Sequence, residues 1–327
     1  MRNFLLALGA LCCLFPASLF AADILIINSY HRSYPWSQAC LKAFEKNIGD
    51  QHNIHYIEMD TKRIHRREFK KQAKAAWEHY EDIDPDIVVL MDDNALKYLG
   101  PDITDDGTPV IFMGVNNDPV NYFDAGIPKN LSGILERPNL KQSAYLVEQL
   151  LPASNRSKLM VMMDAGATSY AIIKTSLAGK SQISFNDHHL RTYLTSSWEE
   201  WKRKVRKLPT DGYDALLLGN YATIKDRYGR QIPLDEVAEW TSVNSKIPVM
   251  GVWRFSIGTR KALGGLVISG KYQGEQAAEL TKITLRNGKT PAIRTPLEGE
   301  LVFSESELAR WQIVLPAALS KDALIID

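Results

Sequence analysis

Residues 23–36 of the chain read DILIINSYHRSYPW. Residues 24–27 are all aliphatic and predict a strand that is buried on both faces. The strand leads into a polar and aromatic loop, and residues 36–48 then show helical spacing. In open α/β sheets built from such units, ligands bind in the loops at the carboxyl ends of the strands. This stretch therefore predicts an α/β fold and the position of a site within it.

The same alternation of short apolar runs and longer amphipathic stretches continues along the chain. The predicted strands lie at residues 23–27, 55–59, 86–91 and 109–113, and then at 158–163, 189–194, 215–218 and 248–252. Residues 133–135 cross between the two groups. Continuous apolar strands separated by helices indicate parallel sheets that are covered on both faces. We therefore expect two similar α/β halves, each with four or five strands.

The last eighty or so residues fit neither half alone. They predict a strand at 264–268, a helix at 274–286, a strand at 301–303 and a helix capped by Ser304, with Glu307 three residues on. A chain that crosses three times between two hinged lobes would explain this arrangement. The expected limits are residues 1–22 for a signal peptide, 23–134 with 270–291 for the N-terminal lobe, and 135–269 with 292–327 for the C-terminal lobe.

Residues 1–22 predict an export signal, because Arg2 precedes an apolar run and Ala21 and Ala22 offer a small-residue cleavage site. We expect a cleaved, periplasmic chain, and we disfavour lipidation of Cys12 or Cys13 because both lie inside the apolar run. The mature chain would keep one cysteine, Cys40, which we expect to be a buried apolar residue without a disulfide partner.

The charge balance and the motifs exclude several function classes. The chain carries 39 Lys and Arg against 38 Asp and Glu, which argues against nucleic-acid binding. It lacks the GxxxxGK, GxGxxG and GxSxG patterns of phosphate loops, dinucleotide folds and hydrolases. His188 and His189 would point apart on a strand, so we expect no metal and no cofactor. The basic run at residues 62–71 predicts a solvated helix face, with a partner-docking patch as the alternative.

The candidate site residues follow the ends of the predicted strands. Aromatic rings after the first strand supply rigid contact area, although they could instead anchor the next helix. A carboxylate after the third strand could bind an ammonium or cap a helix, and hydroxyl and small residues after the fifth suit a helix N-terminus that holds an anion. The predicted contacts are Tyr30, His31, Tyr34, Trp36, Asp93, Asn116, Asp164, Thr168, Ser169, Asn220 and Trp253.

Several segments across nearly the whole mature chain resemble ABC-transporter substrate-binding proteins related to tryptophan- and tyrosine-binding receptors. These segments are residues 116–120 with Asp-Pro-Val, 131–134, 151–159, 247–249 before Gly264-Gly265, and 303–316. The resemblance implies the periplasmic-binding-protein type I fold, with a ligand captured between the lobes and presented to an ABC permease. Residues 28–36 look more like the variant found in extracytoplasmic sensor regions of bacterial signalling proteins.

These observations leave three hypotheses for function. The first is a monomeric, non-enzymatic periplasmic protein that binds a small amino acid or aromatic, zwitterionic molecule and serves an ABC permease. The second is a periplasmic ligand sensor that regulates a membrane histidine kinase or diguanylate cyclase. The third is an exported enzyme that uses His31 with Asp92 or Asp93, for which the sequence offers no obvious nucleophile.

Overall fold

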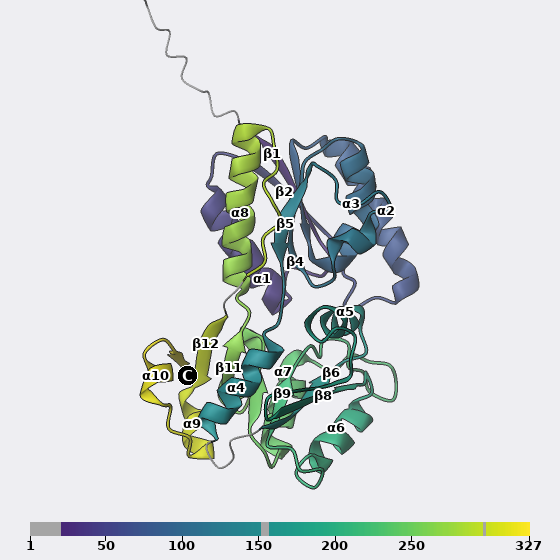
Figure 1. Cartoon of the computed structure of the whole chain (residues 1–327). Helices are drawn as coiled ribbons and strands as arrows, with labels where there is room; N and C mark the ends of the chain where they lie inside the picture. Colours follow the sequence, from purple (N-terminus) through teal and green to yellow (C-terminus); the bar gives the residue numbers. More distant parts are fainter. Residues whose placement is uncertain (1–20, 152–156, 297–298) are drawn as a thin grey trace, which may run out of the picture.

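The computed structural model describes residues 21–151, 157–296 and 299–327, so the predicted signal peptide falls almost entirely outside the described residues. The chain forms two lobes, each built on one sheet (Figure 1). The N-terminal sheet is parallel throughout and has the order β2-β1-β3-β4-β5. Its strands are β1 (Asp23–Asn28), β2 (Asn53–Glu58), β3 (Ile87–Met91), β4 (Val110–Val115) and β5 (Leu131–Leu135).

Helices cover both faces of this sheet because alternate residues of its central strands point to opposite sides. Ile24 and Ile26 of β1 pack with α1 (Pro35–Ile48) and α8 (Gly270–Asn287). Leu25 and Ile27 pack with α2 (Phe69–Ile83) and α3 (Asp92–Asp105) on the other side. Two short 3₁₀ helices, η1 (Arg66–Glu68) and η2 (Pro119–Tyr122), lie in the loops after β2 and β4.

The C-terminal sheet is mixed and has the order β13-β12-β11-β10-β9-β6-β8-β7. Its central strands are parallel, whereas β12 runs antiparallel to β11 and β7 antiparallel to β8. The strands are β6 (Lys158–Met163), β7 (Gln182–Phe185), β8 (His188–Leu194), β9 (Ala215–Leu218), β10 (Val249–Gly251), β11 (Gly264–Val267), β12 (Glu300–Ser304) and β13 (Leu324–Ile326).

Two helices pack on each face of the central strands of this second sheet. One pair is α4 (Leu140–Leu150) with α5 (Ala167–Ser176), and the other is α6 (Trp198–Lys207) with α7 (Leu234–Asn244). The remaining helices are η3 (Arg254–Ser256), α9 (Glu305–Trp311) and α10 (Ala317–Ser320). Ser304 accepts a hydrogen bond from the Glu307 amide at 3.2 Å, which confirms the predicted cap of α9. Cys40 is buried and carries a free thiol.

The chain passes between the lobes after β5, after β11 and after α8, so α8 lies beside α1 although the two are far apart in sequence (Figure 1). The two-lobed α/β architecture with three crossings is therefore confirmed. Contrary to the prediction, the second sheet is not parallel throughout, because β12 runs antiparallel to β11 and β7 to β8. Two strands of the second sheet were not predicted. β7 alternates polar and apolar residues and so lacks a continuous apolar run, and β13 has only three residues. None of the described helices is long and apolar enough to cross a membrane.

Helix α8 approaches α1 closely at Gly274. A Cβ atom at Gly274 would overlap the carbonyl oxygen of Cys40, and the backbone there has little room to move. Gly274→Ala should therefore lower the free energy of unfolding by about 1–3 kcal/mol, measured by urea denaturation. Lys271→Ala, on the exposed side of the same helix, should change it by no more than about 0.5 kcal/mol. Equal stability of the Gly274 variant and the wild type would contradict the close packing.

Candidate ligand-binding cleft

A cavity of about 570 Å³ lies between the two lobes, at the carboxyl ends of strands from both sheets. Its N-terminal wall includes Tyr30 after β1, the segment after β2, and the first turns of α3. Its C-terminal wall includes the first turns of α5 and the loop after β9. Figure 1 shows α5 at the end of its lobe that faces the N-terminal lobe. The cavity therefore occupies the place where open α/β sheets bind small molecules.

The C-terminal wall is organised by the buried side chain of Asp164. Its carboxylate accepts hydrogen bonds from the Gly166 amide at 3.0 Å, the Ser169 hydroxyl at 2.8 Å and the Thr223 amide at 2.8 Å. The Asn220 amide group donates to it at 3.2 Å. Asp164 is thus satisfied within its own lobe, and it fixes the loop so that other groups can face the cavity.

The N-terminal wall is organised in a similar way by Asp93. Asp93 Oδ1 accepts from the Asn117 amide at 2.9 Å and the Tyr122 hydroxyl at 2.8 Å, and Oδ2 accepts from the Asn116 amide at 3.1 Å. Burial raises the pKa of Asp93, and these hydrogen bonds oppose that effect. The carboxylate therefore ties the loop after β4 to the start of α3, and its acceptors are already engaged.

Hydrogen bonds join the two walls at the edges of the cavity. The Tyr30 and Thr168 hydroxyl oxygens are 3.3 Å apart. Trp253 Nε1 donates to Glu136 Oε1 at 3.1 Å, and Lys174 Nζ donates to Asn121 Oδ1 at 3.0 Å. These contacts connect segments more than fifty residues apart in sequence, so they hold the lobes in a closed arrangement.

A group of buried polar side chains adjoins the cavity behind Tyr30 and Asp93. Trp36 Nε1, Asp92 Oδ2, Asn116 Oδ1 and the Tyr221 hydroxyl are buried and have no hydrogen-bond partner in the described part of the chain. Burial raises the pKa of Asp92 well above its ordinary value and that of Glu136 to about 8. Unpaired buried polar atoms are rare in folded proteins, and a concentration of them beside a cavity is typical of a candidate binding site.

The structure brings four of the eleven predicted residues to the cavity wall, namely Tyr30, Asp93, Thr168 and Asn220. The others do not line it. Those buried beside it or behind α5 are Tyr34, Trp36, Asn116, Asp164, Ser169 and Trp253. His31 is only partly buried, and its Nδ1 lies 2.9 Å from the Ser33 hydroxyl.

Most of the charged residues that line the cavity are not among the predicted contacts. The sequence predicts a solvated helix face at residues 62–71, but Lys62 is only 8% exposed and lines the cavity together with Arg66. That interpretation was wrong for Lys62, because the loop after β2 folds inward beside Tyr30. The first turn of α3 is capped from outside the helix, since the Ser29 hydroxyl accepts from the Ala95 amide at 2.7 Å.

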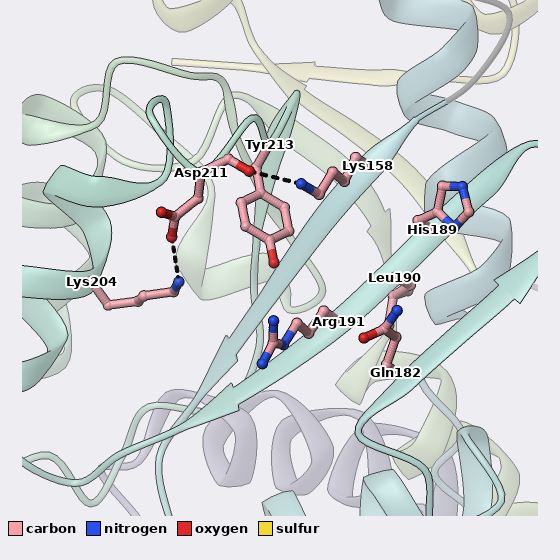
Figure 2. Close-up of a pocket in the computed structure, with 8 residues that line it drawn as sticks. All are labelled: Lys158, Gln182, His189, Leu190, Arg191, Lys204, Asp211 and Tyr213. Carbon is pink, nitrogen blue, oxygen red and sulfur yellow. Dashed lines mark hydrogen bonds and ion pairs between the residues drawn. The ribbon is translucent and has the colours of Figure 1, made fainter.

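A second cavity, of about 470 Å³, lies on the C-terminal lobe alone (Figure 2). It is bounded by Lys158 at the start of β6 and by residues of β7, β8 and α6. Lys204 pairs with the Asp211 carboxylate at 2.7 Å, and Lys158 Nζ donates to the Asp211 carbonyl at 2.7 Å. This cavity is at the amino end of β6, and two of its cations are already partnered. It is a weaker candidate than the interlobe cleft.

The described residues contain no group of three or more His, Cys, Asp or Glu side chains placed to hold a metal ion. The adjacent histidines diverge, as expected on a strand. His188 is buried and contacts the Ser157 hydroxyl at 2.9 Å, whereas His189 is exposed.

No protein-family model and no curated protein matches the chain. Solved structures do match over most of its length. A conserved domain protein from Vibrio cholerae gives a TM-score of 0.68 at 14% identity and covers 94% of this chain and 100% of that one. An ABC domain in complex with L-Trp from Streptococcus pneumonia gives a TM-score of 0.67 at 17% identity and covers 94% of this chain and 100% of that one. A substrate-binding protein from Clostridium difficile, in a ligand-free, open structure, gives a TM-score of 0.63 at 14% identity. It covers 94% of this chain and 99% of that one.

These likenesses show that the chain has the two-lobed type I periplasmic-binding-protein fold, as the resemblance in the sequence implied. At identities of 17% or less they are likenesses of fold, and the site must be argued from the residues of this chain.

Proposed function

We propose that this chain is a non-enzymatic, periplasmic binding protein that captures a small ligand in the cleft between its lobes. The observation that carries the proposal is the cavity of about 570 Å³ whose walls come from the strand ends of both lobes. A ligand held between two walls favours the closed arrangement, because it contacts both lobes only when they are closed. The matching structure with L-Trp is a precedent for a small ligand on this fold.

The closed form would then be recognised by a membrane partner. An ABC permease is the partner that the sequence resemblance implies. The alternative is a membrane histidine kinase or diguanylate cyclase, which the likeness of residues 28–36 to sensor regions favours. Both roles use the same binding event, so a ligand assay tests the common step, and crosslinking in membranes with each partner would separate the two roles.

Ligand binding can be tested with refolded protein, so that any retained ligand is removed first. A compound that binds only the folded chain should raise the melting temperature with concentration. Candidate ligands are amino acids, aromatic acids, sugars, nucleosides and organic anions. If a variant with a blocked cleft, Ala167→Trp, binds every such compound as tightly as the wild type does, the cleft is not the binding site.

Filling the cavity should abolish binding without unfolding the protein. Ala167 is exposed in the first turn of α5 and lines the cavity, so Ala167→Trp would occupy the space of the ligand. We expect the ligand-induced rise in melting temperature to disappear, while the melting temperature without ligand stays within a few degrees of wild type. Ala318→Trp, an exposed position in α10 far from the cavity, serves as the matched control. Normal binding by the Ala167 variant would place the ligand elsewhere.

A further inference from the structure

Almost all of the charged side chains that line the cavity between the lobes are positive. Lys62, Arg66 and Lys97 come from the N-terminal lobe, and Lys174 and Lys225 from the C-terminal lobe. None of these five side chains forms an ion pair within the part of the chain that the structure describes. The single carboxylate in the lining is Asp93, whose oxygens are occupied by two backbone amides and Tyr122. The cavity thus has unneutralised cations on both walls.

Lys62 is the most informative of these cations because its side chain is 8% exposed. Its ammonium group lies 4.3 Å from the centre of the Tyr30 ring and 5.6 Å from that of Tyr34. Such contacts offset only part of the cost of burying an ammonium group. Burial pushes the neighbouring Asp92 toward its neutral form by raising its pKa, although Lys62 opposes that effect. Lys62 has no ion-pair partner in the part of the chain that the structure describes, and an anion in the cavity would supply one.

The first turn of α5 adds a second kind of anion-binding group. This helix has ten residues, its N-cap Gly166 provides no side-chain cap, and Gly166, Ala167 and Thr168 all line the cavity. The unpaired amides of a first helical turn carry partial positive charge and bind anionic oxygens. The Thr168 hydroxyl is a further donor at the same position.

Aromatic side chains complete the lining and indicate that the ligand has a carbon body. The rings that line the cavity belong to Tyr30, Phe69, Tyr98, Tyr122 and Tyr170. Rigid rings of this kind contact the apolar or ring portion of a ligand, while the cations and amides bind its charged ends.

We propose that the ligand is a small organic anion with two or more negatively charged groups, such as a polycarboxylate or a phosphate ester, held between cations of the two lobes. This inference rests on the proposed function and specifies its ligand class. Cations on opposite walls repel each other when the lobes close, and an anion between them converts that repulsion into attraction. Because the attraction is greatest in the closed arrangement, binding of the anion also stabilises closure.

The test compares charged and uncharged compounds of similar shape by calorimetry on the refolded protein. The pairs are phenyl phosphate with phenol, glucose phosphate with glucose, and citrate with its triamide. We also include L-Trp as a zwitterion. We expect the anionic member of at least one pair to bind, its neutral counterpart to bind at least tenfold more weakly, and affinity to fall as salt is added. Preference for phosphate or for carboxylate among the pairs distinguishes the two sources of anionic oxygen.

A variant pair tests whether the cavity cations cause this preference. Lys97→Gln with Lys225→Gln removes one exposed cation from each wall and should weaken anion binding about tenfold. Lys42→Gln with Lys289→Gln makes the same change of net charge at exposed positions away from the cavity and should leave affinity unchanged. An equal effect of both double variants would contradict the proposal.

Other outcomes separate this inference from the proposed function. If L-Trp or a neutral compound binds best and Ala167→Trp abolishes that binding, the cleft is a ligand site but the anion proposal is wrong. If neither member of any pair, nor L-Trp, binds to the refolded wild type, the result counts against both.

Discussion

Glu136→Gln should make the protein more stable at neutral and alkaline pH and should flatten the dependence of its stability on pH. Glu136 is buried at the first crossing between the lobes, and burial raises its pKa from 4.5 to about 8. The Asp93 charge contributes to this rise, while the Trp253 hydrogen bond and the Lys62 charge oppose it. Glutamine keeps an oxygen that can accept from Trp253 Nε1 and carries no titratable proton.

The sign follows from proton binding in the two states. Between pH 4.5 and about 8 the folded chain retains the Glu136 proton and the unfolded chain has lost it. The contribution of Glu136 is therefore fully present below pH 4.5 and is lost as the pH rises through the folded pKa. A tenfold difference in proton affinity between the two states corresponds to about 1.4 kcal/mol, so the loss amounts to a few kcal/mol. Asp92, whose pKa is also raised, acts in the same direction.

Urea unfolding of wild type and variant across this pH range would measure the difference. Glu307→Gln is the matched control, since Glu307 is also buried but its carboxylate pairs with Arg310 at 2.6 Å. That change weakens an ion pair and should lower stability. If the unfolding free energies of wild type and Glu136→Gln run parallel from acid to alkaline pH, the proposed titration of Glu136 is wrong.

The sheets could be predicted from the sequence because their central strands are continuous apolar runs. Residues such as Ile24 to Ile27 are apolar at every position, which is typical of strands covered on both faces. The edge strands β7 and β13 could not be predicted in this way, because β7 alternates polar and apolar residues and β13 has only three residues. The position of the cleft was also predictable, since strand ends meet at one edge of a parallel sheet.

The chemistry of the cleft was less predictable because it depends on contacts between distant segments. The Thr61 hydroxyl donates to the Ser29 carbonyl at 2.7 Å and turns the loop after β2 inward, which buries the adjacent Lys62. In sequence the same lysine belongs to a basic run that is typical of a solvated surface. Glu136 has no local signal either, since its burial arises where the chain crosses to the second lobe and Trp253 approaches.

Asp164→Ala should cause a large loss of stability together with a loss of ligand binding. The substitution would leave two backbone amides, the Ser169 hydroxyl and the Asn220 amide group without their shared acceptor in a buried site. Each buried donor left unpaired costs about 1–3 kcal/mol, so we expect the free energy of unfolding to fall by about 3 kcal/mol or more. Because the same contacts position the first turn of α5 and Asn220, ligand affinity should fall at least about tenfold.

The isosteric change and a control make this test specific to the acceptor. Asp164→Asn retains one oxygen for the Ser169 hydroxyl and the Gly166 amide, but it presents an NH₂ group to the Thr223 amide, so it should be destabilised by less than the alanine variant. Asp226 also accepts two backbone amides, from Tyr228 at 2.8 Å and Arg230 at 2.9 Å, but it lies in a solvent-accessible loop. There water can replace the carboxylate, and Asp226→Ala should cost no more than about 1 kcal/mol. Both aspartates organise a loop in the same lobe. If Asp164→Ala and Asp226→Ala lower the free energy of unfolding equally, burial of the Asp164 network does not stabilise the wall of the cleft.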